Sequence, residues 1–419
     1  MHFVKTASLA IVLIGLLTLG LPLSPAVRSG LAQNQNQNQS QQQRPRRVGE
    51  TDQGSTNTNK SSANSPAGGS AEEVDEGDVV RVETKLVSVP AVITNGAGRP
   101  LVGLRRENFV VFEDGQPQSI ANFGTTEAPF EIALLLDTSG STRDDVALIR
   151  QAANAFIAAL RSNDRVAVTA FNTEQSGNDI SAKVEVLSPL TGDRGALQKA
   201  INNLGSANGT PFYDGLERVA RDVFRESPGE DVRGRRAVVA LTDGVDSASN
   251  VDFAAARAKL LGAGIACYFI QVNTEDFVED RLLKDCADDG RLSLSAKQLE
   301  RYRRIFLPRA KSEDFSNFCQ MGPFERMQIS RQLYNLARKE MNDLSQASGG
   351  RNFVAATLQE ARAAFAQVAN EIGTQYSLGY YPTNKNRDGK FRAIRVEVRG
   401  VKEKTQVRAR EGYVAPRGD

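Results

Sequence analysis

Histidine is nearly absent from this chain of 419 residues, where it occurs once, as His2. That residue lies in an N-terminal segment that we expect to be removed, so the mature protein is predicted to contain none. The absence excludes Ser-His-Asp and Cys-His nucleophile arrangements, and it excludes zinc sites that depend on histidine. Catalysis by carboxylates or by lysine stays open, although the commonest general base is missing.

Cysteine is scarce, with three residues in the chain. Cys267 lies in the apolar run 266–270 and is predicted to be a buried thiol. Cys286 and Cys319 can either form a disulfide in an oxidising compartment or remain two unpaired thiols. The sequence alone does not decide between these two states.

A strong excess of positive charge is lacking too. The chain has 52 lysines and arginines against 50 acidic residues, a formal net charge of +2. Lys5 and Arg28 belong to the segment expected to be removed, which holds no acidic residue, so the mature chain is formally near neutral. Because phosphate binding needs a basic surface, we do not expect nucleic acid as the partner.

The apolar run near the N-terminus, residues 9–21, is short for a membrane span. Lys5 precedes it and small residues follow it, which is the arrangement of a signal peptide with Ala32 as the expected last residue before the cleavage site. We therefore expect residues 1–32 to be removed and the protein to be exported, to the periplasm, the cell surface or the medium. An uncleaved segment would be a membrane anchor, and membrane contact is expected only in that case.

Residues 33–78 are rich in Gln, Asn, Ser and Gly and contain no aromatic residue. Such a composition cannot bury enough surface to offset the entropy of ordering, so we expect a disordered tether. The next segment, 79–128, and the last, 374–416, both contain strand-like alternation of apolar and polar residues. Because neither has enough strands to be stable alone, we expect both to join in one small β-sandwich.

Between these segments, residues 129–373 alternate strand and helix patterns. Residues 132–136 are apolar throughout, as expected for a strand buried on both faces, and apolar residues then recur at helical spacing from 146 to 160. The alternation predicts a doubly wound α/β fold, Rossmann-like, with a mostly parallel sheet and helices on both faces, inserted in the β-sandwich. Further helices are expected at about 211–225, 328–347 and 357–372.

Five oxygen-bearing side chains stand where strands end or helices begin. Asp137, Ser139 and Ser141 directly follow the first buried strand. Thr210 precedes a helix, and Asp243 follows another buried strand. Because the carboxyl ends of parallel strands meet at one edge of a sheet, we expect these side chains to lie together. Oxygen ligands suit hard cations, so the sequence predicts a site for Mg²⁺, or for Mn²⁺ or Ca²⁺.

Each of these motifs also has a purely structural interpretation. Asp and Ser are common in turns and helix caps, so Asp-x-Ser-x-Ser alone is a weak signal. Thr210 before Pro211 suits the start of a helix, and Asp243-Gly244 is an ordinary turn dipeptide. The order of the motifs and their common position at strand ends favour the metal site.

The segment that carries these residues resembles a von Willebrand factor A domain, and the five residues match that family's metal-ion-dependent adhesion site. The resemblance implies that Ser139, Ser141 and Thr210 bind the cation directly. It implies that Asp137 and Asp243 hold the charge and the bound waters. It also implies that a carboxylate of a protein partner fills the last coordination position.

The wider chain resembles the exported von Willebrand A-related proteins of acidobacteria. The similar pieces, besides the N-terminus, are residues 113–115, 137–141, 348–351, 375–382, 388–391 and 410–416. The function of that family is poorly defined, so this resemblance implies a fold and an exported location more than an activity.

Residues 275–324 interrupt the alternation and are expected to be an insertion with its own helix. Ser295, with Gln298 three residues later, is a capping-box signal, and Pro308 ends the helix. The insertion leaves from the carboxyl end of strand 266–272, at the edge that carries the metal site. We therefore expect it to border the site and to influence the choice of partner, or else to fold away from it.

These residues favour a non-enzymatic function: metal-dependent protein binding outside the cytoplasm, as an adhesin or an assembly scaffold. A second hypothesis is a structural envelope protein whose metal only stiffens the fold. A third is a carboxylate-based hydrolase, which would need paired carboxylates in a cleft, and the spacing singles out no such pair.

Overall fold

The computed structural model describes most of the chain from residue 86 onward. The described residues are 86–139, 146–176, 179–227, 231–232, 234–284, 294–315 and 318–418. The expected signal peptide, 1–32, and the expected tether, 33–78, lie outside them. Within the described residues no helix combines the length and the apolar character that a membrane span requires.

A six-stranded sheet forms the centre, in the order β10-β9-β8-β5-β6-β7. Its neighbouring strands run parallel, except that β6 and β7 form an antiparallel pair. The bounds are β5 (Glu131–Leu136), β6 (Arg165–Ser176), β7 (Asp179–Thr191), β8 (Arg236–Thr242), β9 (Ala266–Val272) and β10 (Arg351–Ala355). The predicted doubly wound, mostly parallel sheet is therefore confirmed.

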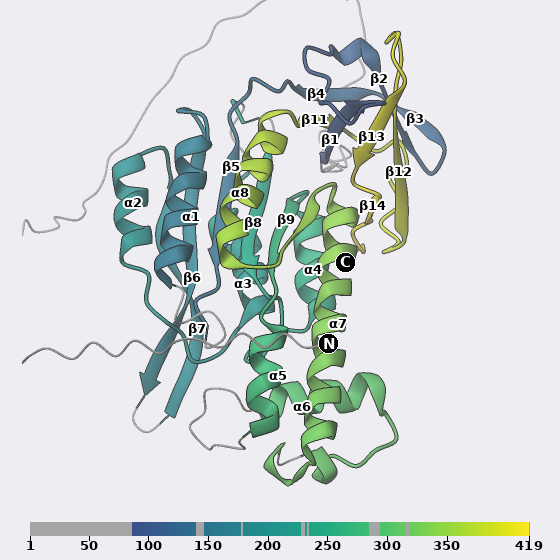
Figure 1. Ribbon diagram of the computed structural model, residues 1–419. Helices are drawn as coiled ribbons and strands as arrows, with labels where there is room; N and C mark the ends of the chain where they lie inside the picture. The colour runs from purple at the N-terminus through teal and green to yellow at the C-terminus, as the bar shows by residue number, and fades with distance from the viewer. Residues whose placement is uncertain are drawn as a thin grey trace, which may run out of the picture. The chain divides into compact units, whose positions relative to one another are not determined.

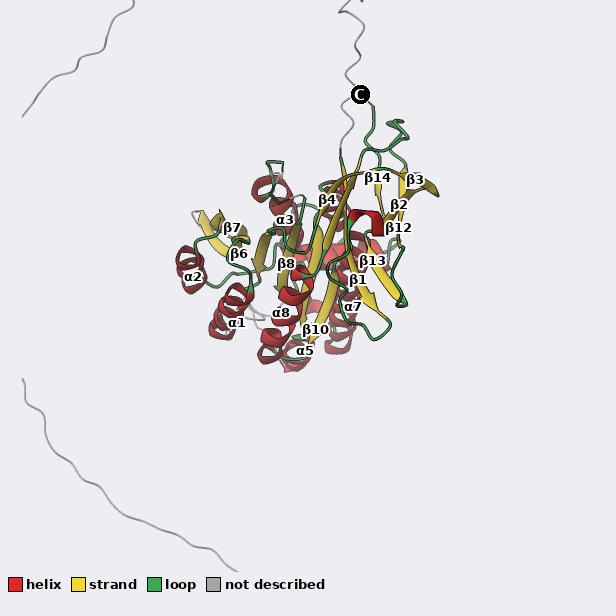
Figure 2. Cartoon of the chain, turned by 90° about the horizontal axis from the view of Figure 1, so that it is seen from above, coloured by secondary structure: helices red, strands yellow, loops and turns green. Residues whose placement is uncertain are grey.

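Helices cover both faces of this sheet (Figures 1 and 2), and the strand residues alternate between the two apolar cores that result. In β5, Leu134 packs in the first core and Leu135 in the second. The first core includes α1 (Val146–Ala159), α2 (Arg194–Asn202) and α8 (Leu358–Gly373). The second includes α3 (Phe212–Arg218), α4 (Phe253–Gly262) and α7 (Pro323–Ser348).

The terminal segments form two antiparallel sheets that share one apolar core, which confirms the expected sandwich. One sheet has the order β13-β1-β11-β4 and the other β14-β12-β2-β3. N-terminal strands are β1 (Val87–Asn95), β2 (Phe109–Glu113), β3 (Gln116–Gln118) and β4 (Ile120–Gly124). C-terminal strands are β11 (Tyr376–Tyr380), β12 (Phe391–Val398), β13 (Thr405–Ala409) and β14 (Gly412–Val414). Each sheet thus mixes strands from both ends of the chain.

Several helices differ from the sequence-based expectations. The helix expected at 211–225 is α3 followed by a π-helical turn at Val219–Val223. The helix expected from 328 begins at Pro323, because a proline suits the first turn of a helix and Gly322 occupies the N-cap. Helix α2 was not expected; the carboxylate of Asp193 caps it by accepting from the backbone N–H groups of Gly195 and Ala196.

The insertion contains two helices, α5 (Glu275–Lys284) and α6 (Ala296–Phe306), rather than one. The capping box of Ser295 and Gln298 is present at the start of α6, as predicted. Two 3₁₀ turns follow, Glu313–Phe315 and Phe318–Gln320. These elements and the first half of α7 share an apolar core of their own. Figure 1 shows α5 and α6 at the end of the central sheet away from the β-sandwich.

The cysteines agree with the sequence where the structure describes them. Cys267 is free and buried in the second core. Burial raises the pKa of its thiol to about 12, so it stays protonated and inert. Cys319 is disulfide-bonded. Cys286, its suggested partner, lies outside the described residues.

A buried ionic cluster connects the two ends of the chain inside the sandwich. Glu113 of β2 is 2% exposed, and its carboxylate accepts from the hydroxyls of Tyr380, at 2.6 Å, and Tyr413, at 2.9 Å. The Arg392 guanidinium of β12 lies 3.2 Å from the same carboxylate. Burial and hydrogen bonding to Glu113 raise the pKa of both tyrosines, which keeps them as donors. The cluster therefore joins β2 to three C-terminal segments.

We expect Glu113→Ala to lower the free energy of unfolding by about 3–5 kcal/mol, because it leaves the Arg392 charge buried without its carboxylate. Glu397→Ala on β12 is the matched control, since it removes only surface ion pairs to Arg395 and Arg399 and should change stability by less than about 1 kcal/mol. Urea unfolding of the two variants measures the difference. Equal losses would contradict the assignment of the cluster as the link between the chain ends.

Candidate metal site

The first part of the site follows from strand register. Strands β5 and β8 are parallel, with Leu136 opposite Leu241, so Asp137 and Thr242 emerge side by side. The Thr242 hydroxyl donates to Asp137 Oδ2 at 2.6 Å, and the backbone N–H of Ser139 donates to Asp137 Oδ1 at 3.0 Å. Asp137 and Ser139 are 1% and 2% exposed. The register thus buries a carboxylate at the carboxyl edge of the sheet.

Asp243 lies one residue beyond β8, and its carboxylate is also held at both oxygens. The Val245 N–H donates to Oδ1 at 3.0 Å, which forms the turn expected for Asp243-Gly244. The Thr274 hydroxyl, just after β9, donates to Oδ2 at 2.7 Å. The Tyr334 hydroxyl of α7 lies 2.7 Å from Thr274 Oγ1 and must be the donor, because the single Thr274 proton is used on Asp243. The turn and the buried carboxylate therefore coexist.

Thr210 reaches the same edge through the loop that precedes α3. Its N–H donates to Ser247 Oγ at 2.8 Å, and the Ser247 N–H donates to the Thr210 carbonyl at 3.0 Å. Helix α3 begins at Phe212 with Pro211 at the N-cap position, so Thr210 lies before the cap. Pro211, and not Thr210, therefore occupies the cap of α3, and the alternative interpretation of Thr210 as the helix cap is wrong.

The electrostatics of these groups fit a cation. Burial, together with the nearby Asp243 carboxylate, raises the pKa of Asp137 to about 7. Hydrogen bonds from Ser139 and Thr242 lower the pKa of Asp137 but offset only part of this rise. Two buried carboxylates at one sheet edge thus disfavour each other's ionised form, and a divalent cation between them would favour it. The donor set of carboxylate and hydroxyl oxygens suits Mg²⁺, Mn²⁺ or Ca²⁺.

The structure brings four of the five predicted residues to one edge: Asp137, Ser139, Thr210 and Asp243. Ser141 lies outside the described residues. Among the described residues there is no group of three or more His, Cys, Asp or Glu side chains placed to hold a metal. A metal site here would therefore depend on hydroxyl ligands beside two carboxylates, and the predicted set of ligands stays a prediction.

Sequence analysis missed the residues that support the two carboxylates. Thr242 is the last residue of β8, and Thr274 lies two residues beyond the end of β9. Both therefore carried the signal that was used for the other ligands, a polar residue at a strand end. Tyr334 carried none, because it comes from a helix 60 residues farther along the chain than Thr274.

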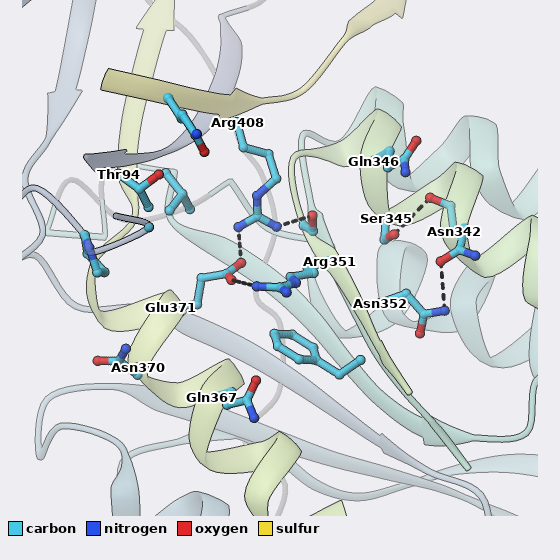
Figure 3. A pocket seen from close by; sticks show the side chains of 16 residues that line it. Thr94, Asn342, Ser345, Gln346, Arg351, Asn352, Gln367, Asn370, Glu371 and Arg408 are labelled. Carbon is cyan, nitrogen blue, oxygen red and sulfur yellow. Dashed lines mark hydrogen bonds and ion pairs between the residues drawn. The ribbon is translucent and has the colours of Figure 1, made fainter. Parts of the chain in front are cut away.

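A pocket of about 550 Å³ lies beside the first residues of β10, between the sandwich and helix α8. Figure 3 shows Glu371 held by Arg408 of β13 and by Arg351, whose Nη1 lies 3.8 Å from Glu371 Oε2. Glu371 is the single carboxylate among the described residues that line this pocket. Because a glycosidase needs two carboxylates, the pocket lacks the constellation that the hydrolase hypothesis requires.

The central part of the chain is similar to a known protein family. Residues 131–301 match the family model of the von Willebrand factor type A domain. The match runs from the start of β5 into α6. No curated protein sequence matches the chain.

Solved structures resemble the chain at low identity. Proximal thread matrix protein 1 from the mussel byssus, described with a zinc-occupied MIDAS motif, is 13% identical with a TM-score of 0.36 over 58% of this chain and 48% of that chain. BatB from Bacteroides thetaiotaomicron is 15% identical, with a TM-score of 0.35 over 58% of this chain and 98% of that chain. A von Willebrand factor type A protein from Catenulispora acidiphila is 13% identical, with a TM-score of 0.37 over 74% of each. This chain thus spans about half of the mussel protein's length.

We expect Mn²⁺ and Mg²⁺ to raise the melting temperature of the wild type, by an amount that corresponds to about 2.7 kcal/mol at 100 times the dissociation constant. Asp137→Asn should abolish this shift, because it removes one of the two charges that attract the cation. The exposed Asp343 of α7 provides a matched control, Asp343→Asn, which should keep the full shift. A similar shift in both variants would contradict the site.

The same variant has a pH-dependent signature without metal. The folded-state pKa of Asp137, about 7, is higher than the ordinary aspartate value of 3.8, so its ionisation destabilises the fold progressively from about pH 4 to pH 7. In the presence of a chelator, Asp137→Asn should therefore gain stability relative to the wild type as pH rises through this window. Thermal unfolding at pH 5 and pH 8 tests the sign.

Proposed function

We propose that this protein uses its von Willebrand factor type A domain to bind a protein ligand through a divalent cation, as an adhesin or an assembly scaffold. The observation that carries the proposal is the pair of buried carboxylates, Asp137 and Asp243, that parallel strands β5 and β8 place at one sheet edge beside hydroxyl groups.

Each residue has a role in the proposed site. Ser139, Ser141 and Thr210 would bind the cation directly, while Asp137 and Asp243 would supply negative charge and orient bound waters. Hydroxyl ligands are neutral, so a cation held mostly by them keeps a strong attraction for one more carboxylate. That attraction is what the bound cation supplies, and a protein partner that presents Asp or Glu would satisfy it.

The chemistry of the donors favours Mg²⁺, with Mn²⁺ and Ca²⁺ as alternatives. Zinc sites are usually built from Cys and His ligands, and the expected mature chain has no histidine. Oxygen ligands with retained water suit a hard cation. Manganese binds the same ligand types and is the convenient probe for measurement.

A non-enzymatic role is the better supported of the alternatives. In the pocket between the sandwich and helix α8, Glu371 is the one carboxylate among the described lining residues, and two arginines already hold it. Asp137 and Asp243 lie close together but are enclosed by hydrogen bonds from Thr242 and Thr274. We further propose that the protein acts outside the cytoplasm, which rests on the signal-peptide pattern around residues 9–21. Kinship with the acidobacterial proteins stays a prediction from the sequence.

The test is a pull-down from an envelope extract of the source organism with Mg²⁺ or with EDTA. We expect a ligand to be captured by the wild type only with Mg²⁺, and to be lost with the double variant Asp137→Ala plus Ser139→Ala, because the variant cannot hold the cation. Asp343→Ala serves as the control and should capture as the wild type does. Capture that is the same in all samples, or absent, would favour a structural protein with a stabilising metal instead.

A further inference from the structure

Helix α6 of the insertion begins beside the loop that holds Thr210. The Ser295 hydroxyl, which caps α6, donates to the carbonyl of Ser247 at 2.7 Å. Ser247 in turn exchanges two hydrogen bonds with the backbone of Thr210. Hydrogen bonds through a single residue, Ser247, therefore link the start of α6 to the candidate metal ligand Thr210.

Lys297, in the first turn of α6, holds the next residues of the same loop. Its Nζ donates to the Ala248 carbonyl at 2.7 Å, the Ser249 carbonyl at 3.1 Å and Asn250 Oδ1 at 3.0 Å. An ammonium group has three N–H donors, so all of them are used on one loop segment. The side chain is exposed, so this bonding has no role in filling a core.

Arg301, one turn farther along α6, contacts the helix that follows Thr210. Its guanidinium lies over the Tyr213 ring of α3, 4.7 Å from the centroid, and its Nη2 lies 2.7 Å from both carboxylate oxygens of Glu340 in α7. The Tyr213 hydroxyl donates to the same Glu340 at 2.8 Å. The Tyr213 N–H donates to Asp246 Oδ2 at 3.2 Å, in the loop after Asp243.

We infer that α6 is a positioning helix for the metal site. Ser295 and Lys297 fix residues 247–250, Arg301 fixes Tyr213 of α3, and Thr210 is held between them, so that the affinity for the divalent cation depends on the insertion. The inference rests on the proposed function. It assigns to α6 a role in metal binding in addition to the role of the strands and loops that carry the candidate ligands.

The physical reason is the narrow geometry that Mg²⁺ demands. The ion requires near-octahedral ligands at about 2.0–2.1 Å, so a loop that moves by a few tenths of an ångström loses affinity. Groups that orient metal ligands without contacting the metal typically change affinity by about 10–100-fold when they are removed. Ser247 is the connection here, because it bonds to Thr210 on one side and to Ser295 on the other.

Charge repulsion alone predicts the opposite change in metal affinity. Lys297 and Arg301 are cations close to a proposed cation site, so their removal would strengthen metal binding if they acted only by repulsion. A positioning role predicts weaker binding when Lys297 loses its charge and its donors together. The direction of the change therefore separates the two explanations.

The experiment is a calorimetric Mn²⁺ titration of the full chain at fixed ionic strength. We expect Lys297→Met to weaken binding by about 10-fold, at the lower end for such supporting residues. Lys339→Met, at an exposed lysine of α7, makes the same change of charge on another helix and should bind as the wild type does. Melting temperatures in EDTA establish that both variants are folded to the same extent.

A second pair of variants tests the hydroxyl of Ser295 without changing charge. Ser295→Ala should weaken Mn²⁺ binding, and Ser295→Thr, which keeps the hydroxyl, should restore it. If Lys297→Met and Ser295→Ala both bind Mn²⁺ as tightly as the wild type, or more tightly, the positioning role is wrong while the proposed function stands. If the wild type itself binds no Mn²⁺, the proposed function fails, and the inference fails with it.

Discussion

The parallel register of β5 and β8 is the constraint on which the candidate site depends. By placing Leu136 opposite Leu241 it brings Asp137 beside Thr242 and forces two carboxylates toward one point at the sheet edge. Their mutual repulsion is tolerated because both strands are buried on two faces and cannot slip without exposing apolar residues. The electrostatic tension that raises the pKa of Asp137 is thus imposed by the apolar packing of the sheet.

Much of the fold could be predicted because its signals are local. The apolar run of β5 and the capping box of Ser295 each depend on a few neighbouring residues. Four candidate ligands follow from the same reasoning, since a parallel sheet collects strand ends at one edge. Thr274 followed that rule as well and was overlooked.

The contacts that sequence reasoning could not supply join distant segments. Tyr334 reaches Thr274 across 60 residues, and Lys297 reaches Ala248 across 49. No periodicity or spacing marks such pairs, because they depend on how an insertion packs on the sheet. The proposed site therefore has ligands whose positions follow from the fold topology, and supporting residues whose positions follow from the packing of α6 and α7. A single sequence allows only the ligands to be predicted.

The sandwich has a consequence for how the protein is made. Its first strands, β1 and β2, leave the ribosome before the central domain, whereas their partners β11 and β12 are synthesised last. Val87 cannot pair with Tyr380, nor Glu113 with Arg392, until the later residue has been synthesised. At about 5–20 residues per second this takes more than ten seconds. During that time the apolar faces of β1 and β2 lack their native cover, so the nascent chain relies on chaperones or on prompt folding of the central sheet to bring its ends together.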